Sequence, residues 1–336
     1  MLEVVLPWVK LGFCTLIIAL AGPVLVRNGE RIARLTGLSQ TWIGVVLLAT
    51  ATSLPELFTG VSAITLADAP NIAVADALGS CLFNLLMLVL LDELSRSEPL
   101  FRRIDQGHIL TAGFGTILIG TVGAIVMLNS MGMDFSVFHI SAYSPLLAIL
   151  YFVAMRASFD HQRRGNPAGL QTDPPSREAL RAAFGQYAVA AMFVIAAGIW
   201  LPFIGLEIAQ AMDWQTTFVG TLLIAASTSV PELFVAISAL RMRVIDLAIG
   251  GLLGSNLFDV LILVIDDALY TKGPLLAAVS PAHVVTAFAA VIMSGIFIVA
   301  VLFQPETKVR GIISWTSISL LVVYLFSAYA SFLIGL

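Results

Sequence analysis

The chain consists mainly of apolar stretches about twenty residues long, separated by short polar segments. Such stretches predict membrane-spanning helices, because a helix needs roughly 20 mostly apolar residues to cross the hydrocarbon core of a bilayer. We therefore expect an all-α polytopic membrane protein with about ten transmembrane helices. The predicted spans are residues 9–26, 41–66, 72–91, 108–127, 140–155, 184–208, 217–240, 245–265, 283–303 and 312–333.

One long polar segment divides these spans into two groups of five. It lies within residues 156–183 and contains HQRRGNPAGLQTDPPSRE, whose glycines, prolines and charges are typical of a linker. We therefore expect two five-helix halves, residues 1–155 and 184–336, joined by this linker.

The basic residues predict an orientation for the ten spans. Fifteen of the 17 lysines and arginines fall in loops on one side, and only Lys10 and Lys272 fall on the other. Because Lys and Arg are enriched in cytoplasmic loops, the linker is expected to be cytoplasmic and both termini outside. Only 11% of the residues are charged, against about 25% in soluble domains. We expect an integral protein of a bacterial inner (plasma) membrane, in contact with the lipid bilayer and with no nucleic-acid partner.

A segment of about fifty residues occurs twice. GVVLLATATSLPELFTGVSAI, from Gly44, aligns with GTLLIAASTSVPELFVAISAL, from Gly220, and NIAVADALGSCLFN then aligns with DLAIGGLLGSNLFD. The copies occupy about residues 41–91 and 217–266. In the predicted topology the first copy begins on an outward-running span and the second on an inward-running one. Inverted repeats of this kind are typical of secondary transporters, whose ion sites lie near the membrane midplane.

Each copy combines a helix-breaking proline with oxygen-bearing side chains. Pro55 and Pro231 lack an N–H group and clash with the carbonyl four residues back, so the helix must kink or unwind there. Freed carbonyls, hydroxyls and the buried acids Glu56 and Glu232 would together offer the oxygen ligands that Ca²⁺ prefers. Two ionised glutamates balance one Ca²⁺, and with a third acid they balance two or three Na⁺. The motif therefore predicts a cation site shared by the two copies.

The second span of each copy adds a polar pair four residues apart, a spacing that places both side chains on one helix face. The pairs are Ser80 with Asn84 and Ser255 with Asp259, and a glycine precedes each pair, Gly79 and Gly254. Glycines can let two helices approach closely, although ordinary packing explains them equally well.

ATSLPEL and STSVPEL, each followed by a GS-x-x-x-N/D segment, resemble the two α-repeats of the sodium/calcium exchanger family, within the calcium/cation antiporters. The resemblance implies a transporter rather than an enzyme, without a cofactor, that exchanges Ca²⁺ for Na⁺ by alternating access. By the same resemblance, the ion ligands would be the Ala49 carbonyl, Thr52, Ser53, Glu56, Ser80 and Asn84, together with the Ala225 carbonyl, Thr228, Ser229, Glu232, Ser255 and Asp259.

The chain departs from the family pattern at three positions. Asp76 and Cys81 stand where the family usually has asparagine in the first copy, and Gly251 does so in the second. Asp76 is expected either to line the outer ion path or to lie near the N-terminus of its helix, where negative charge is favoured. Cys81 is expected beside the ligand face. These departures leave the ion selectivity open.

The remaining acids and histidines predict no further site. Asp92, Glu93, Asp266 and Asp267 are expected to be solvated span ends or partners of nearby arginines. The four histidines are scattered without metal-ligand spacing.

The sequence allows three alternatives to Na⁺/Ca²⁺ exchange. The first is an antiporter of Ca²⁺ or another divalent cation that is coupled to H⁺ on the same scaffold, although proton-coupled relatives usually carry a GN-x-x-E pattern that this chain lacks. The second is a passive channel, which gains nothing from a deep site that holds its ion tightly. The third is an intramembrane enzyme, for which the chain lacks a Ser/His or metal-ligand constellation.

Overall fold

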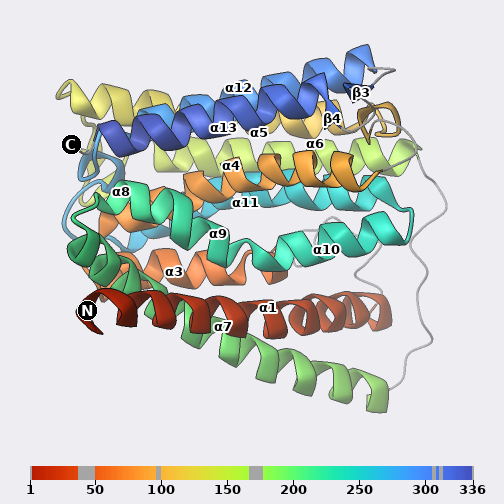
Figure 1. The fold of residues 1–336 in the computed structure, drawn as a ribbon, viewed down its shortest axis with the longest axis horizontal. Helices are drawn as coiled ribbons and strands as arrows, with labels where there is room; N and C mark the ends of the chain where they lie inside the picture. Colours follow the sequence, from red (N-terminus) through yellow and green to blue (C-terminus); the bar gives the residue numbers. More distant parts are fainter. Residues whose placement is uncertain are drawn as a thin grey trace.

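The structure is a computed structural model that describes residues 2–36, 50–95, 100–165, 177–304, 308–309 and 313–334. Its helices run along a common direction, with both chain termini at one end of the bundle (Figure 1). The ends of helices α6 and α7 that flank residues 166–176 lie at the opposite end.

The helices of the first half are α1 (Leu2–Leu35), α3 (Leu54–Thr65), α4 (Pro70–Leu94), the 3₁₀ turn η2 (Leu100–Arg102), α5 (His108–Ser130) and α6 (Ser144–Gly165). Those of the second half are α7 (Arg177–Met212), α8 (Thr216–Val219), the π-helix η3 (Gly220–Ile224), α9 (Ala225–Thr228), α10 (Val230–Arg241), α11 (Ile245–Leu269), the 3₁₀ turn η4 (Leu275–Ala277), α12 (His283–Phe303) and α13 (Trp315–Leu333). In the described residues the only strands are two antiparallel hairpins, β1 (Ser136–Val137) with β2 (Ile140–Ser141) and β3 (Lys308–Val309) with β4 (Ile313–Ser314).

The expectation of an all-α polytopic membrane protein is confirmed. Seven described helices are long and apolar enough to cross a membrane, namely α1, α4, α5, α7, α11, α12 and α13, and the bent series α8–α10 makes an eighth candidate. Helix α6 overlaps the predicted span 140–155 but is not among these candidates, because its C-terminal half carries several charges. Most of the first part of the predicted span 41–66 lies outside the described residues.

Both TS-x-PE segments interrupt a helix. Residues 50–52 are helical, Ser53 leaves helical geometry (φ −90°, ψ 22°), and α3 begins at the next residue with Pro55 in its first turn. In the second copy Ser229 (φ −81°, ψ 10°) separates α9 from α10, and the segments on either side of it differ in direction by 47°. A proline in the first turn needs no N–H partner, so it starts each new helix without cost. The predicted helix breaks are confirmed.

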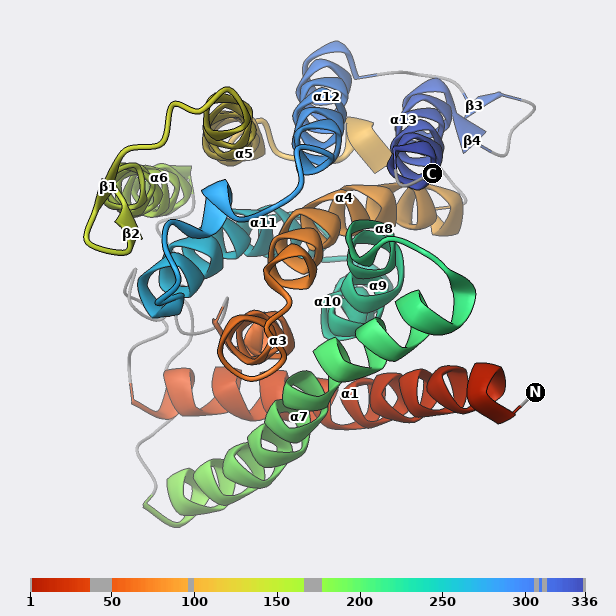
Figure 2. The same ribbon diagram turned by 90° about the vertical axis from the view of Figure 1, so that its left-hand side faces the viewer.

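The long helices α1 and α7 cross each other (Figure 2), and each packs against the break in the other half. A Cβ atom on Gly22 of α1 would lie 2.7 Å from Cγ of Pro231, and one on Gly198 of α7 would lie 3.0 Å from the carbonyl oxygen of Pro55. Only glycine allows such a close approach without displacement. The separation between Gly22 and Gly198 equals that between the two motifs, so the two halves make matching contacts.

Asp92 and Asp267, at the ends of α4 and α11, were expected to be solvated or paired with arginine, and the expectation that they are solvated is wrong. Both are buried. Each carboxylate accepts one hydrogen bond from a backbone amide in the turn that follows its helix. It accepts two more from a pair of serines, one amide and one hydroxyl, at the start of α13 for Asp92 and of α6 for Asp267. The donors to Asp92 are Leu100 N (2.8 Å), Ser314 N (3.2 Å) and Ser317 Oγ (2.8 Å), and those to Asp267 are Leu275 N (2.7 Å), Ser141 N (2.8 Å) and Ser144 Oγ (2.5 Å). These carboxylates join helices that are distant in sequence.

Asp92→Asn or Asp267→Asn is expected to lower the thermal unfolding midpoint of the detergent-purified protein by several degrees. The amide keeps one acceptor oxygen, but its NH₂ group then faces a hydroxyl and an amide that also donate. Each lost bond to a charged group costs about 1.5–3 kcal/mol. Glu93→Gln is the matched control, since Glu93 is an exposed neighbour at the same helix end. An unchanged midpoint in both Asp variants would contradict a stabilising role for these carboxylates.

Candidate functional site

The two repeated motifs meet in the interior and exchange hydrogen bonds. Ser53 Oγ donates to Glu232 Oε1 at 3.4 Å, and Ser229 Oγ donates to Glu56 Oε1 at 3.3 Å. Only 2% of Glu56 and 3% of Glu232 is exposed. The serine at each helix break thus contacts the glutamate of the other copy, so both glutamates face one region of the protein interior and not lipid.

Helices α4 and α11 complete this region with polar side chains. Ser255 Oγ donates to Glu232 Oε1 at 3.4 Å and lies 3.3 Å from Thr52 Oγ1. Thr228 Oγ1 donates to Asp76 Oδ1 at 2.9 Å. The other polar residues that the sequence singled out on these helices, Ser80, Asn84 and Asp259, are also buried.

Several buried oxygen atoms here have no hydrogen-bond partner among the described residues. They are Glu56 Oε2, Glu232 Oε2, Asp76 Oδ2, Asp259 Oδ1, Ser80 Oγ and Asn84 Oδ1. Buried polar atoms are normally paired, and a buried charge is costly unless it is compensated. Four buried carboxyl groups lie in this region, and like charges in such a setting disfavour one another. A cation held among these oxygens would remove both costs.

The donor set fits a hard cation that is bound reversibly. Within the described part of the chain, no group of three or more His, Cys, Asp or Glu side chains is arranged to hold a metal ion. The acids are instead interspersed with hydroxyl groups and a side-chain amide, which suit Ca²⁺ or Na⁺ rather than a soft metal. Transport requires binding that is favourable and still reversible.

The two alanine carbonyls expected as ligands differ in what the structure says of them. Ala49 lies outside the described residues. The carbonyl oxygen of Ala225 accepts hydrogen bonds from Ser229 N (3.0 Å) and Thr228 Oγ1 (3.1 Å). The Thr228 hydroxyl has a single proton, so when it donates to Asp76 Oδ1 instead, the Ala225 carbonyl keeps a lone pair for an ion. The π-helix η3 ends at the preceding residue, and such insertions are frequent at functional sites.

Asp76 lies in this region and not at a helix terminus. It is 1% exposed and falls in the second turn of α4, on the same face as Ser80 and Asn84. The favourable effect of a helix N-terminus on negative charge fades within the first turn, so that interpretation of Asp76 is wrong. Its contact with Thr228 makes it a neighbour of the proposed ligands.

Asp76→Asn is expected to weaken the apparent affinity for Ca²⁺ about tenfold, which corresponds to ~1.4 kcal/mol. The asparagine can still accept the hydrogen bond from Thr228, so the change is mainly the loss of one negative charge. The measurement is initial Ca²⁺ uptake as a function of Ca²⁺ concentration. The control is Asp134→Asn in an exposed loop, and equal affinities in the two variants would contradict a role for the Asp76 charge.

The sequence analysis did not single out Asn256, and it placed Cys81 beside the ligand face without a direct contact to a ligand. Asn84 Nδ2 donates to Asn256 Oδ1 at 2.9 Å, and Asn256 Nδ2 donates to the Cys81 carbonyl at 3.3 Å. Cys81 Sγ lies 3.6 Å from Asp259 Oδ2, so the thiol contacts an expected ligand directly. The signal for Asn256 was available, because it directly follows Ser255 in the GSN sequence.

Asp266, which was expected at a solvated span end, is completely buried. Neither of its carboxylate oxygens has a hydrogen-bond partner within the described residues. The carboxyl group lies against Gly60, one helical turn beyond Glu56 on α3, where an added Cβ atom would overlap it. Asp266 therefore continues the series of buried acids beyond the two glutamates.

Three comparisons relate this chain and its fold to known proteins. The model of the sodium/calcium exchanger protein family matches residues 6–164 and 182–333. The chain is 26% identical over 243 residues to the uncharacterized membrane protein MJ0091 of Methanocaldococcus jannaschii, covering 70% of this chain and 72% of that protein. It is 26% identical over 258 residues to the inner membrane protein YrbG of Escherichia coli, covering 77% of this chain and 78% of that protein.

Two solved structures share the fold. The native structure of YfkE superposes with a TM-score of 0.67 at 20% identity, covering 98% of this chain and 93% of that one. The sodium-calcium exchanger NCX_Mj, soaked with Na⁺ and Sr²⁺, superposes with a TM-score of 0.61 at 23% identity, covering 97% of this chain and 99% of that one.

Proposed function

The chain belongs to the sodium/calcium exchanger protein family, and we propose that it exchanges Ca²⁺ for Na⁺ by alternating access at the site between its two broken helices. It is a membrane cation antiporter, and the proposal concerns its ions and their ligands. The observation that carries it is the pair of crossed hydrogen bonds between Ser53 and Glu232 and between Ser229 and Glu56. Each glutamate retains a second oxygen without a partner among the described residues.

In this proposal Glu56 and Glu232 are the main carboxylates for Ca²⁺, and Thr52 and Thr228 add hydroxyl oxygens. The remaining expected ligands, which complete the Na⁺ positions, are Ser53, Ser229, Ser80, Asn84, Ser255, Asp259 and the carbonyls of Ala49 and Ala225. Two glutamates balance one Ca²⁺, and a third acid lets two or three Na⁺ occupy the same region. Ca²⁺ and Na⁺ would therefore compete for shared oxygens, which is what exchange requires.

The proposed arrangement in the membrane has the linker at residues 156–183 in the cytoplasm and both termini outside. Both termini lie at one end of the bundle, and the helix ends that flank residues 166–176 lie at the other (Figure 1). The concentration of basic residues on the linker side supports this direction. Gly22 and Gly198 make equivalent contacts, with Pro231 and Pro55 respectively. Asp92 and Asp267 likewise accept equivalent sets of hydrogen bonds. Both equivalences support two halves of the same design. The relative from E. coli, named an inner membrane protein, supports a bacterial inner membrane.

Radiolabelled Ca²⁺ uptake into liposomes that contain the purified protein tests the proposal. Vesicles loaded with Na⁺ and diluted into Na⁺-free buffer should accumulate Ca²⁺, because outward Na⁺ flow drives inward Ca²⁺ movement. Vesicles with equal Na⁺ on both sides serve as the control. Uptake that is the same in both preparations would refute coupling to Na⁺.

Coupling to H⁺ is the second candidate, since two further acids are buried near this site. Asp76 contacts Thr228, and Asp266 lies against Gly60, one helical turn from Glu56 on α3. These carboxyl groups could carry protons across without any Na⁺ ligand. The test is the same uptake assay with a pH gradient, acidic inside, and no Na⁺ on either side. Ca²⁺ uptake under these conditions would favour H⁺ coupling, and its absence would remove that candidate.

A further inference from the structure

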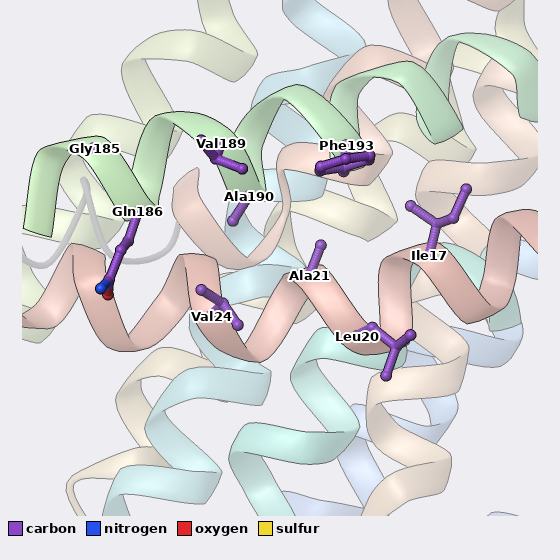
Figure 3. A pocket seen from close by; sticks show the side chains of 9 residues that line it. All are labelled: Ile17, Leu20, Ala21, Val24, Gly185, Gln186, Val189, Ala190 and Phe193. Carbon is purple, nitrogen blue, oxygen red and sulfur yellow. The ribbon is translucent and has the colours of Figure 1, made fainter.

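A groove runs between α1 and α7 where the two long helices cross (Figure 3). It has a volume of about 550 Å³, and its walls include Ile17, Leu20 and Val24 of α1 and Val189 and Phe193 of α7. All of these side chains are at least partly exposed. An apolar groove on a membrane-spanning helix pair faces hydrocarbon, so its natural occupant is an acyl chain. We call it the α1/α7 groove.

A second, basic pocket continues from this groove toward the C-terminal end of α1. It has a volume of about 430 Å³, its charged side chains are Arg27, Glu30, Arg31 and Arg34, and it shares Val24 and Gln186 with the groove. The arginines follow directly on the predicted span 9–26, at the depth where lipid headgroups begin. We call this region the arginine pocket.

The arginine pocket carries a surplus of positive charge. Arg34 lies 3.8 Å from Glu30, the one acid of the pocket. Arg27 and Arg31 are exposed and form no ion pair with a carboxylate in the described residues. Arg27 Nε donates to the carbonyl oxygen of Pro23 at 3.0 Å, which leaves the two NH₂ groups of Arg27 and the guanidinium of Arg31 for an anion. Guanidinium binds phosphate through paired hydrogen bonds.

From this junction of an apolar groove and a basic pocket, we propose that the chain binds an anionic phospholipid of the cytoplasmic leaflet. One acyl chain lies in the α1/α7 groove, and the phosphate contacts Arg27 and Arg31. Basic pockets between transmembrane helices on the cytoplasmic side are known to suit anionic headgroups. A free phosphate ion would not fill the adjoining apolar groove, so the occupant is a lipid.

Such a lipid would act on the proposed ion site through α1. Gly22 of α1 packs on Pro231 at the second helix break, and Thr15 Oγ1 donates to Ser227 Oγ on α9 at 2.8 Å. A lipid between α1 and α7 would therefore favour the arrangement of α1 against α9 and α10 that the structure shows. The consequence for transport rests on the proposed function, whereas lipid binding does not.

The experiment measures binding of phosphatidylglycerol and phosphatidylcholine to the purified full-length protein by native mass spectrometry. Phosphatidylglycerol should bind at least fivefold more tightly, and the double variant Arg27→Gln, Arg31→Gln should lose this preference. The control variant Arg241→Gln, Arg243→Gln removes two basic residues from another loop on the same side and should keep it. Equal binding of the two lipids to the unaltered protein, or an undiminished preference in the first variant, would overturn the proposal.

A further variant separates a lipid from a free anion. Gly185 lines the groove, and a Cβ atom there would have no atom of the described residues within 4 Å, so Gly185→Leu should fill the groove without disturbing the fold. We expect it to weaken phosphatidylglycerol binding several-fold while its thermal midpoint in phosphatidylcholine is unchanged. Displacement of the lipid by millimolar inorganic phosphate, or full binding in Gly185→Leu, would show that the acyl chain contributes nothing and would contradict the lipid assignment.

Discussion

Glu56→Gln or Glu232→Gln is expected to reduce Ca²⁺ exchange at least about a hundredfold. Glutamine has nearly the same shape and can still accept the hydrogen bond from the opposite serine, so the change mainly removes one charge. At 4 Å and an effective dielectric constant of 20, a pair of unit charges interacts by about 4 kcal/mol. A loss of even two thirds of that energy corresponds to roughly a hundredfold in affinity.

The measurement is Na⁺-driven uptake of radiolabelled Ca²⁺ into liposomes, with each variant reconstituted at equal density. The control is Glu178→Gln, an exposed glutamate in the first turn of α7, which should transport at the normal rate. Comparable thermal midpoints would show that the variants are folded. Near-normal Ca²⁺ flux in either glutamate variant would remove that residue from the centre of the mechanism.

Gly79→Ala is expected to reduce transport at least about tenfold. A Cβ atom at this position of α4 would lie 2.6 Å from the carbonyl oxygen of Thr221 and 2.8 Å from Cβ of Ala225. Backbone atoms cannot move aside as a flexible side chain can, and overpacking of this kind typically costs 1–3 kcal/mol. The added methyl group would push α4 away from η3 and from α9, and α9 carries both Ala225 and Thr228.

Gly254→Ala is the matched control, because Gly254 occupies the corresponding position in the second copy and, among the described residues, no atom lies within 4 Å of its added Cβ. It should transport at close to the normal rate. Both variants are assayed by the same Ca²⁺ uptake. Equal transport rates in Gly79→Ala and Gly254→Ala would contradict the claim that the site requires the close packing at Gly79.

The spans and the two helix breaks could be predicted from the sequence because their causes are local. Twenty apolar residues suffice to span a bilayer, and proline interrupts a helix wherever it occurs in the interior. The repeat added the expectation that Glu56 and Glu232 share one region, and the structure brings them there. By contrast, the π-helix η3 depends on how α8 and α9 pack against α4, and no local residue pattern predicts it.

The acids at the span ends show where sequence reasoning stops. Asp92 was expected to be solvated, but one of its donors, Ser317, lies 225 residues away in the chain. Asp266 and Asp267 are adjacent and share the same local sequence. Among the described residues, only Asp267 accepts hydrogen bonds from serines and backbone amides. Burial at a helix end is decided by which distant element covers it. Among the described residues, Gly79 packs closely against such a distant element and Gly254 does not.

The position of a bound Sr²⁺ ion in a crystal of this protein, located by its anomalous scattering, tests most directly whether the two broken helices form one cation site. We expect a peak in contact with both Glu56 and Glu232, among the hydroxyl oxygens of Thr52 and Thr228, and we expect Na⁺ to displace it. A Sr²⁺ ion that contacts neither glutamate, or that binds beside Asp266 instead, would contradict this assignment.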